Sequence, residues 1–211
     1  MKRPANVFAQ PAGSATFKSD RAVPGTYSPD GESSVVAEQA SVRGSERSDS
    51  STEKPPVALI VERITHQDVP AICGLYKKVW DPAPQGIATE HAKAWQPTPL
   101  EFTSWMEGVT YFAARKNGHV VGVVGCELRH ASCRIVHLAV DPETRRQGVA
   151  TALIGAASEW AKKGNASSIW VDTLAPFVSA TALFTHLGFA RAGVLHRHEW
   201  NDDVNLFERI L

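Results

Sequence analysis

The chain has 211 residues, a formal net charge of zero at pH 7 and 43% hydrophobic residues, which together fit one globular domain with additional polar sequence. A balanced charge argues against a broad basic surface for nucleic acid, and no apolar run approaches the roughly 20 residues that span a bilayer. The three cysteines form no CxxC pair, which argues against a disulfide framework. We therefore predict a cytoplasmic protein that binds neither nucleic acid nor membrane.

Residues 1–56 are rich in Ser, Gly, Glu, Arg and Pro and contain few aromatic residues. Such a segment cannot bury enough apolar surface to offset the entropy of ordering it, so we predict a disordered N-terminal tail and linker. Its first stretch is basic, which leaves an organellar transit peptide as an alternative. The folded domain is expected to comprise residues 57–211.

The first half of this domain alternates strand and helix patterns. An apolar run at 57–61 predicts a strand, and Thr65-x-x-Asp68 resembles a capping box ahead of helical spacing that continues to Val79. A proline-rich segment follows, with its best helical stretch at 99–107. Asn117-Gly118 between two apolar runs then predicts a hairpin of strands 110–115 and 119–129.

The second half begins with an almost continuously apolar strand at 134–140, a pattern typical of strands that are covered on both faces. A helix is expected from about 149 to 163, a strand at 167–171 and a short helix at 179–187. Two closing strands are expected at 190–195 and 204–211. The order predicts an α/β fold with a mixed, mostly antiparallel central sheet flanked by helices.

The turn RRQGVA, at 145–150, joins the apolar strand to the long helix. The unpaired N–H groups and the dipole of a helix N-terminus attract anions, and Gly148 lets a phosphate approach the backbone closely. Arg145 and Arg146 add positive charge. The residues alone also fit a plain strand-turn-helix connection with a basic turn.

This turn resembles the pyrophosphate motif of the GNAT (Gcn5-related N-acetyltransferase) superfamily. HLAVDP before it and ATALFTHLGF after it, at 180–189, resemble the flanking motifs of that family in order and distance. The resemblance covers residues 57–211 and implies the GNAT fold and a bound acetyl-CoA, held within the segment His137–Thr151. Backbone groups of the strand would pair with the pantetheine arm, and the turn would cradle the pyrophosphate. The implied cofactor residues here are Leu138, Ala139, Val140, Arg145, Arg146, Gln147, Gly148, Val149, Ala150 and Thr151.

Acetyl transfer to an amine requires a neutral nucleophile, whereas an amine of the lysine type has a pKa near 10.4. A proton acceptor is therefore expected. Many peptide-modifying relatives carry a Glu at the strand position that is Arg134 here. We consider Glu127 the first candidate base and His137 the second, with a solvated strand-end carboxylate and a satisfied core histidine as the structural alternatives.

The resemblance also implies a general acid, because relatives commonly protonate the departing thiolate with a Tyr. This chain has Phe184 at that position, and Ser179 stands where the family has an Asn. We expect both residues to face the cofactor. The alternatives are core packing for Phe184 and a helix N-cap role for Ser179.

The acceptor is expected to be a primary amine on a small molecule or a protein. Carboxylates and rings between the first helix and the hairpin suit a cationic amine, although they also fit a helix with an apolar stripe: Glu90, Glu101, Glu107, Trp95, Phe102 and Trp105. The eight histidines show no metal-binding spacing, so no metal is expected. An acyl-CoA-binding sensor with little turnover is the alternative function. The oligomeric state is left open, with a homodimer as one option.

Overall fold

The computed structural model describes residues 58–81 and 83–211, so the predicted tail at 1–56 lies outside the described residues. Twelve longer helices and strands and two short 3-10 turns, η1 (His66–Asp68) and η2 (Pro142–Thr144), follow one another along these residues. The first half contains β1 (Leu59–Arg63), α1 (Val69–Trp80), α2 (Thr89–Ala94), α3 (Pro99–Trp105), β2 (Thr110–Lys116) and β3 (His119–Arg129). The second half contains β4 (Ser132–Val140), α4 (Val149–Lys163), β5 (Ser168–Leu174), α5 (Val178–His186), β6 (Ala190–Glu199) and β7 (Asp202–Ile210).

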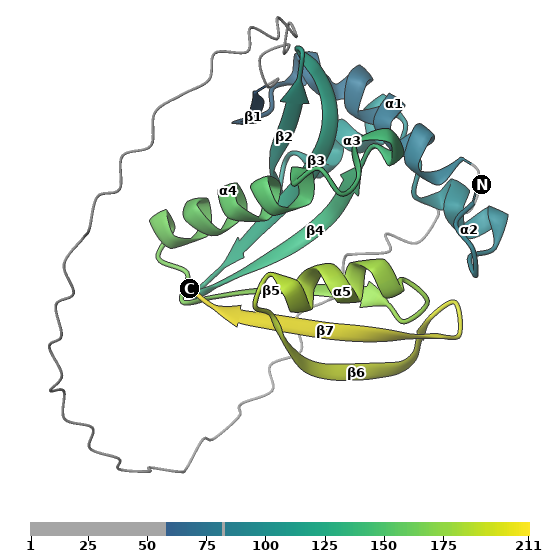
Figure 1. Cartoon of the computed structure of the whole chain (residues 1–211), viewed down its shortest axis with the longest axis vertical. Coiled ribbons are helices and arrows are strands. Elements are labelled where there is room, and N and C mark those ends of the chain that lie inside the picture. The colour runs from purple at the N-terminus through teal and green to yellow at the C-terminus, as the bar shows by residue number, and fades with distance from the viewer. Residues whose placement is uncertain (1–57, 82) are drawn as a thin grey trace, which may run out of the picture. The chain divides into compact units, whose positions relative to one another are not determined.

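All seven strands form one sheet in the order β1-β2-β3-β4-β5-β7-β6. Every neighbouring pair is antiparallel except β4 and β5, which run parallel. Figure 1 shows α4 running across β2, β3 and β4, with α1 and α3 near the upper ends of the same strands. This architecture confirms the α/β fold with a mixed, mostly antiparallel sheet.

Side-chain alternation along the strands gives each face of the sheet its own core. On one face, Leu153, Ile154 and Ala157 of α4 pack against buried residues of β3, β4 and β5, and α5 adds Phe184. On the other face, Ile72, Leu75 and Tyr76 of α1 pack with Phe102 of α3 against β2 and β3. Burial on both faces explains the nearly continuous apolar sequence of β4.

The parallel pair β4 and β5 separates partway along its length. Pairing runs from Ser132 opposite Ser168 to Ile135 opposite Val171. Strand β4 then continues to Val140 and β5 to Leu174, but within the described residues no further pairing joins them. The sheet therefore has an opening at its centre, where backbone groups of β4 face away from β3.

A bulge in β4 lies at the start of this opening. The register with β3 shifts between Val123 and Gly125, and His137 has a φ of +55°, in the left-handed region. Tyr76 of α1 donates a hydrogen bond to the His137 carbonyl at 2.6 Å. A bulge turns the strand locally and re-aims its side chains. Here α1 holds the turned residue in place.

Two elements differ from the sequence prediction. Helix α2 lies in the proline-rich segment, before the one helical stretch predicted there at 99–107, and its six residues are too few to produce a clear helical period. The closing hairpin is also longer than expected, because β6 reaches Glu199 and only Trp200 and Asn201 separate it from β7. Both of these residues have positive φ, as tight hairpin turns require.

Candidate functional site

The turn 145–148 lies before α4, carries two arginines and is the cradle predicted to hold a pyrophosphate. Arg146 and Gly148 have φ of +62° and +79°, and left-handed residues among extended ones curve the backbone so that its N–H groups converge. Gly148 is the N-cap of α4, and a Cβ added to it would meet no protein atom within 4 Å. Protein side chains therefore leave the space directly beside the Gly148 backbone open.

The side chains around this cradle are mainly polar and exposed. Gln147 donates to the Glu143 carbonyl at 3.1 Å and accepts from Lys116 Nζ at 2.8 Å. Lys116 thus brings a third cation to the rim beside Arg145 and Arg146, a contribution that its place in a hairpin gave no reason to predict. Thr151 is exposed and Ala150 partly exposed, whereas Val149 is buried against the core and anchors the helix.

The unpaired part of β4 leads directly into this cradle. Leu138 and Val140 turn their side chains to the α4 face and Ala139 to the α1 face, so their backbone groups lie along the opening beside β5. An extended chain placed there can add to the strand through backbone hydrogen bonds. The structure therefore brings together the ten predicted cofactor residues from 138 to 151 along one path.

His137 lies in an enclosed aromatic environment. Its ring stacks on Trp105 at 4.3 Å between centroids and on Tyr111 at 6.0 Å, and the Tyr111 hydroxyl is 2.5 Å from Nδ1. Burial, helped by the charge of Arg134, lowers the pKa of His137 to about 4. A ring with so low a pKa is a weak proton acceptor. These contacts favour the satisfied histidine over the role of base.

Because the pKa of His137 is lower in the folded protein than its usual value of about 6.5, the unfolded chain binds more protons between these two values. Stability contributed by the neutral ring should be complete above about pH 6.5 and decline as pH falls toward 4. NMR titration of the ring and urea melts across this range would measure both effects. The variant His137→Gln should lose this part of the pH dependence. A His137 ring that titrates near pH 6.5 in the folded protein would contradict the prediction.

Glu127, the first candidate base, belongs to a row of charged side chains across β3, β4 and β5. It lies opposite Arg134 in the β3–β4 register. Arg134 in turn donates to Asp172 Oδ1 from Nε at 3.0 Å and from Nη2 at 2.8 Å, and its guanidinium lies 5.0 Å from the Trp170 ring centroid. The Glu127 side chain is 15% exposed, so it is neither sealed in the core nor fully solvated.

The row has a further carboxylate that the sequence analysis missed. Glu199, at the end of β6, has a pKa raised to about 7 by burial and by the charge of Asp172, against the opposing effect of Arg134. Its Oε1 is buried and has no hydrogen-bond partner among the described residues. Nothing near Glu199 in the sequence points to this position, because only the folding of the long hairpin brings it toward β5.

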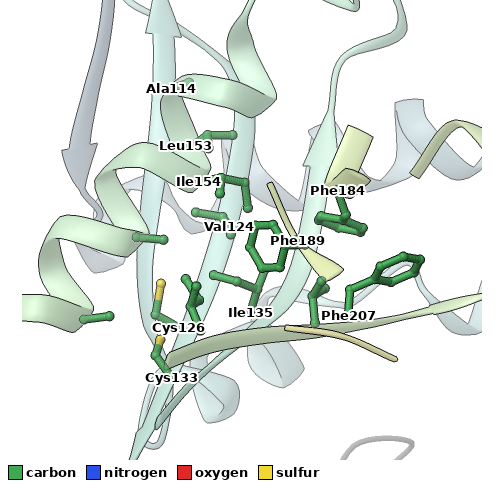
Figure 2. Close-up of a cluster of buried hydrophobic side chains, with 14 of the residues drawn as sticks. Ala114, Val124, Cys126, Cys133, Ile135, Leu153, Ile154, Phe184, Phe189 and Phe207 are labelled. Atoms are coloured by element: carbon green, nitrogen blue, oxygen red, sulfur yellow. The ribbon is translucent and has the colours of Figure 1, made fainter. Parts of the chain in front are cut away.

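The structure bears on the structural roles considered for Ser179 and Phe184 of α5, whereas the predicted contact of Ser179 with the cofactor stays a prediction. The N-cap of α5 is Phe177 rather than Ser179, so the cap alternative for Ser179 does not apply. Phe184 is 2% exposed, and its ring packs against Phe189 at 5.7 Å and Phe207 at 6.0 Å. Figure 2 shows Phe184 close to Phe207 on the side of the sheet that α4 covers. This placement favours core packing over a position facing the thiol.

Phe184→Tyr is therefore expected to destabilise the protein by about 1 to 3 kcal/mol, because a buried hydroxyl without a partner loses its hydration. No gain in turnover is expected. Thermal melts of this variant and of Phe112→Tyr, whose ring is partly exposed on β2, would isolate the effect of burial. If Phe184→Tyr instead increased turnover and left stability unchanged, the ring at position 184 would lie beside the sulfur of coenzyme A.

Several of the carboxylates and rings considered for an amine acceptor have structural contacts. Glu101 completes the capping box of α3 with Thr98, and Phe102 is fully buried, so both have structural roles. Trp105 stacks on His137, and Trp95 joins an aromatic cluster described below. Glu90 and Glu107 are exposed on the surface.

The rest of the described structure adds neither a metal centre nor a membrane helix. Residues 58–81 and 83–211 contain no group of three or more His, Cys, Asp or Glu side chains placed to hold a metal ion. No helix in this part of the chain is long and apolar enough to cross a bilayer.

Comparison with known proteins agrees with this geometry. The profile of the acetyltransferase (GNAT) family matches residues 73–189, which include β4, the cradle and α5. The chain belongs to the GNAT family. Membership confirms the resemblance seen in the sequence and supports acetyl transfer in general terms.

Two human proteins share part of this GNAT sequence. N-acetyltransferase 8B is 33% identical over 105 residues, or 47% of this chain and 46% of that protein. N-acetyltransferase 8 is 35% identical over 92 residues, which are 41% of this chain and 40% of that protein. The chain therefore spans less than half the length of these relatives.

Solved structures share the GNAT fold at low sequence identity. The ribosomal-protein-S18-alanine N-acetyltransferase of Escherichia coli has a TM-score of 0.60 at 18% identity, covering 72% of this chain and 94% of that one. The PaiA N-acetyltransferase of Thermoplasma acidophilum was solved in complex with coenzyme A. It has a TM-score of 0.63 at 12% identity, and the match covers 73% of this chain and 99% of that one. At these identities the likeness shows the fold alone.

Proposed function

We propose that this GNAT protein transfers the acetyl group of acetyl-CoA to a primary amine by direct attack, without an acetylated enzyme intermediate. The observation that carries the proposal is the continuous path from the unpaired part of β4 to the cradle at Gly148. An extended pantetheine arm fits the first part and a pyrophosphate the second. Arg145, Arg146 and Lys116 would add positive charge around the phosphates.

In this proposal Glu127 accepts the proton of the acceptor amine. The carboxylate stands on the sheet face that carries Arg134 and Asp172, one strand away from β4. Water can reach it, since the side chain is partly exposed, so a proton can be passed on to solvent. An amine that has lost its proton can attack the acetyl carbonyl, and the carbon–sulfur bond then breaks.

The position where relatives carry a Tyr offers no general acid for the departing thiolate, because residue 184 is a Phe without an acidic hydrogen and its ring is buried in the core. A thiol with a pKa near 8.5 gives a thiolate that is already a fair leaving group. We therefore propose turnover without a dedicated acid from α5. Protonation of coenzyme A would then follow departure.

The second candidate function is an acyl-CoA-binding sensor, which the absence of a Tyr at position 184 favours. A thiol-release screen separates the two functions. The full chain would be incubated with acetyl-CoA and peptides with free N-termini, lysine peptides, polyamines or small amines. Amine-dependent release of coenzyme A supports the transferase, whereas tight acetyl-CoA binding without release in any class would support the sensor.

A further inference from the structure

An aromatic cluster lies next to Glu199, outside the cofactor path. Four rings form it, and they come from four separate segments of the chain: Trp80 at the end of α1, Trp95 after α2, Phe177 before α5 and Trp200 in the β6–β7 turn. The centroid distances are 4.6 Å between Trp80 and Trp95, 4.9 Å between Trp95 and Trp200, and 5.7 Å between Trp95 and Phe177. All four rings are partly exposed, and they pack against a small buried core of Ile87, Ala92, Leu174 and Val204, so the cluster has one side in the core and one side toward solvent.

Two polar atoms, one in a ring of the cluster and one on Glu199, are buried without a hydrogen-bond partner among the described residues: Trp80 Nε1 and Glu199 Oε1. Such atoms are uncommon in native proteins, because each one loses its hydration without compensation. One is a donor and the other an acceptor. A cationic group that donates a hydrogen bond would satisfy the Glu199 acceptor.

The charges nearby select the sign of this ligand. Arg134 donates a hydrogen bond to Asp172. The charge of Asp172 in turn raises the pKa of Glu199. A cation placed between Glu199 and the ring faces would relieve the repulsion of the two carboxylates and gain from the rings. His91 of α2 stacks on Trp200 at 4.0 Å and holds that ring in position.

We infer that Glu199 and the four rings form a subsite that binds a second, non-reacting cationic group of the acceptor. The inference rests on the proposed function, since it assigns the reacting amine to the Glu127 end of the row. The acceptors that fit are diamines and other amines that carry a second positive charge at a distance from the first. Glu199 is then a specificity residue and not the base.

The test compares straight-chain diamines of increasing length with alkyl monoamines of the same length, using the full chain. Wild type should acetylate at least one diamine with a KM about 10-fold or more below the KM of the monoamine of the same length. This factor is what one hydrogen bond to a charged group typically contributes. Glu199→Gln should remove this difference by raising only the diamine KM. Glu199→Asp should restore part of it, and Glu208→Gln, which removes an exposed carboxylate of β7, should change neither KM.

Two further readouts keep the inference separate from the proposed function. Diamine should change the tryptophan fluorescence of wild type and not of Glu199→Gln, whether or not turnover occurs. The melting temperature of Glu199→Gln should be unchanged or higher, because a buried carboxylate is removed. Equal KM values of wild type for diamines and monoamines would overturn the proposed subsite. A lower melting temperature of Glu199→Gln with an unchanged ratio of the two KM values would do the same. Failure to acetylate any amine would overturn the proposed function, and the fluorescence result alone would then decide the subsite.

Discussion

Replacing Gly148 with Asp is expected to abolish measurable binding of coenzyme A while the domain stays folded. Position 148 begins α4 with a φ of +79°, and its missing side chain leaves the cradle open. An Asp side chain would place a carboxylate where the pyrophosphate is proposed to lie, so both space and charge would oppose binding. Calorimetry should show a loss of at least about 100-fold in affinity, which corresponds to ~2.7 kcal/mol.

The fold should tolerate this change. A Cβ at position 148 meets no protein atom within 4 Å, and Asp is a favourable residue at a helix N-cap. The positive φ costs roughly 1 to 3 kcal/mol for a residue other than glycine. Gly188→Asp is the matched control, because Gly188 has a φ of +80° and lies beyond the far end of α5. Coenzyme A binding that survives in folded Gly148→Asp would remove the basis of the cradle assignment.

Glu127→Gln is expected to lower kcat by about 100-fold or more at neutral pH, as the loss of a general base typically does. The amide keeps the shape of the side chain but cannot accept the proton of an ammonium group. The deficit should shrink at high pH, where more of the amine is already neutral. A pH-rate profile of wild type and variant, at saturating acetyl-CoA, measures both effects.

The control for this variant is Glu159→Gln, an exposed carboxylate on α4, the helix that covers the opposite face of the sheet. It removes the same charge without touching the row that contains Arg134. Full activity of Glu127→Gln at neutral pH would return the role to His137 or to water.

Most of the fold could be predicted because its signals are local. The hairpin at Asn117-Gly118, the capped start near Thr65 and the long helix after the basic turn each depend on residues within a few positions of one another. The proposed cofactor path rests on signals of the same kind, since strand, turn and helix follow directly in the chain. Helix α2 was missed because six residues contain less than two helical turns.

The proposed acceptor subsite could not be predicted in this way, because distant segments of the chain contribute to it. Glu199 and Asp172 lie on different strands, and Trp80, Trp95 and Trp200 meet only after the hairpin and α2 have packed together. The same limit applies to Phe184. Its sequence position matches a catalytic residue of relatives, but the rings that enclose it come from β7 and from the turn after α5.

The central claim is tested most directly by following a radiolabelled acetyl group through a single turnover of the full chain. Labelled acetyl-CoA would be mixed with excess protein and with the amine that gives the fastest thiol release, and the products would be separated by mass. Direct attack predicts that the label moves to an amide of the acceptor, with one coenzyme A released for each amide formed and none of the label on the protein. Label that remains on coenzyme A in a saturated complex, or that becomes bound to the protein, would contradict the account.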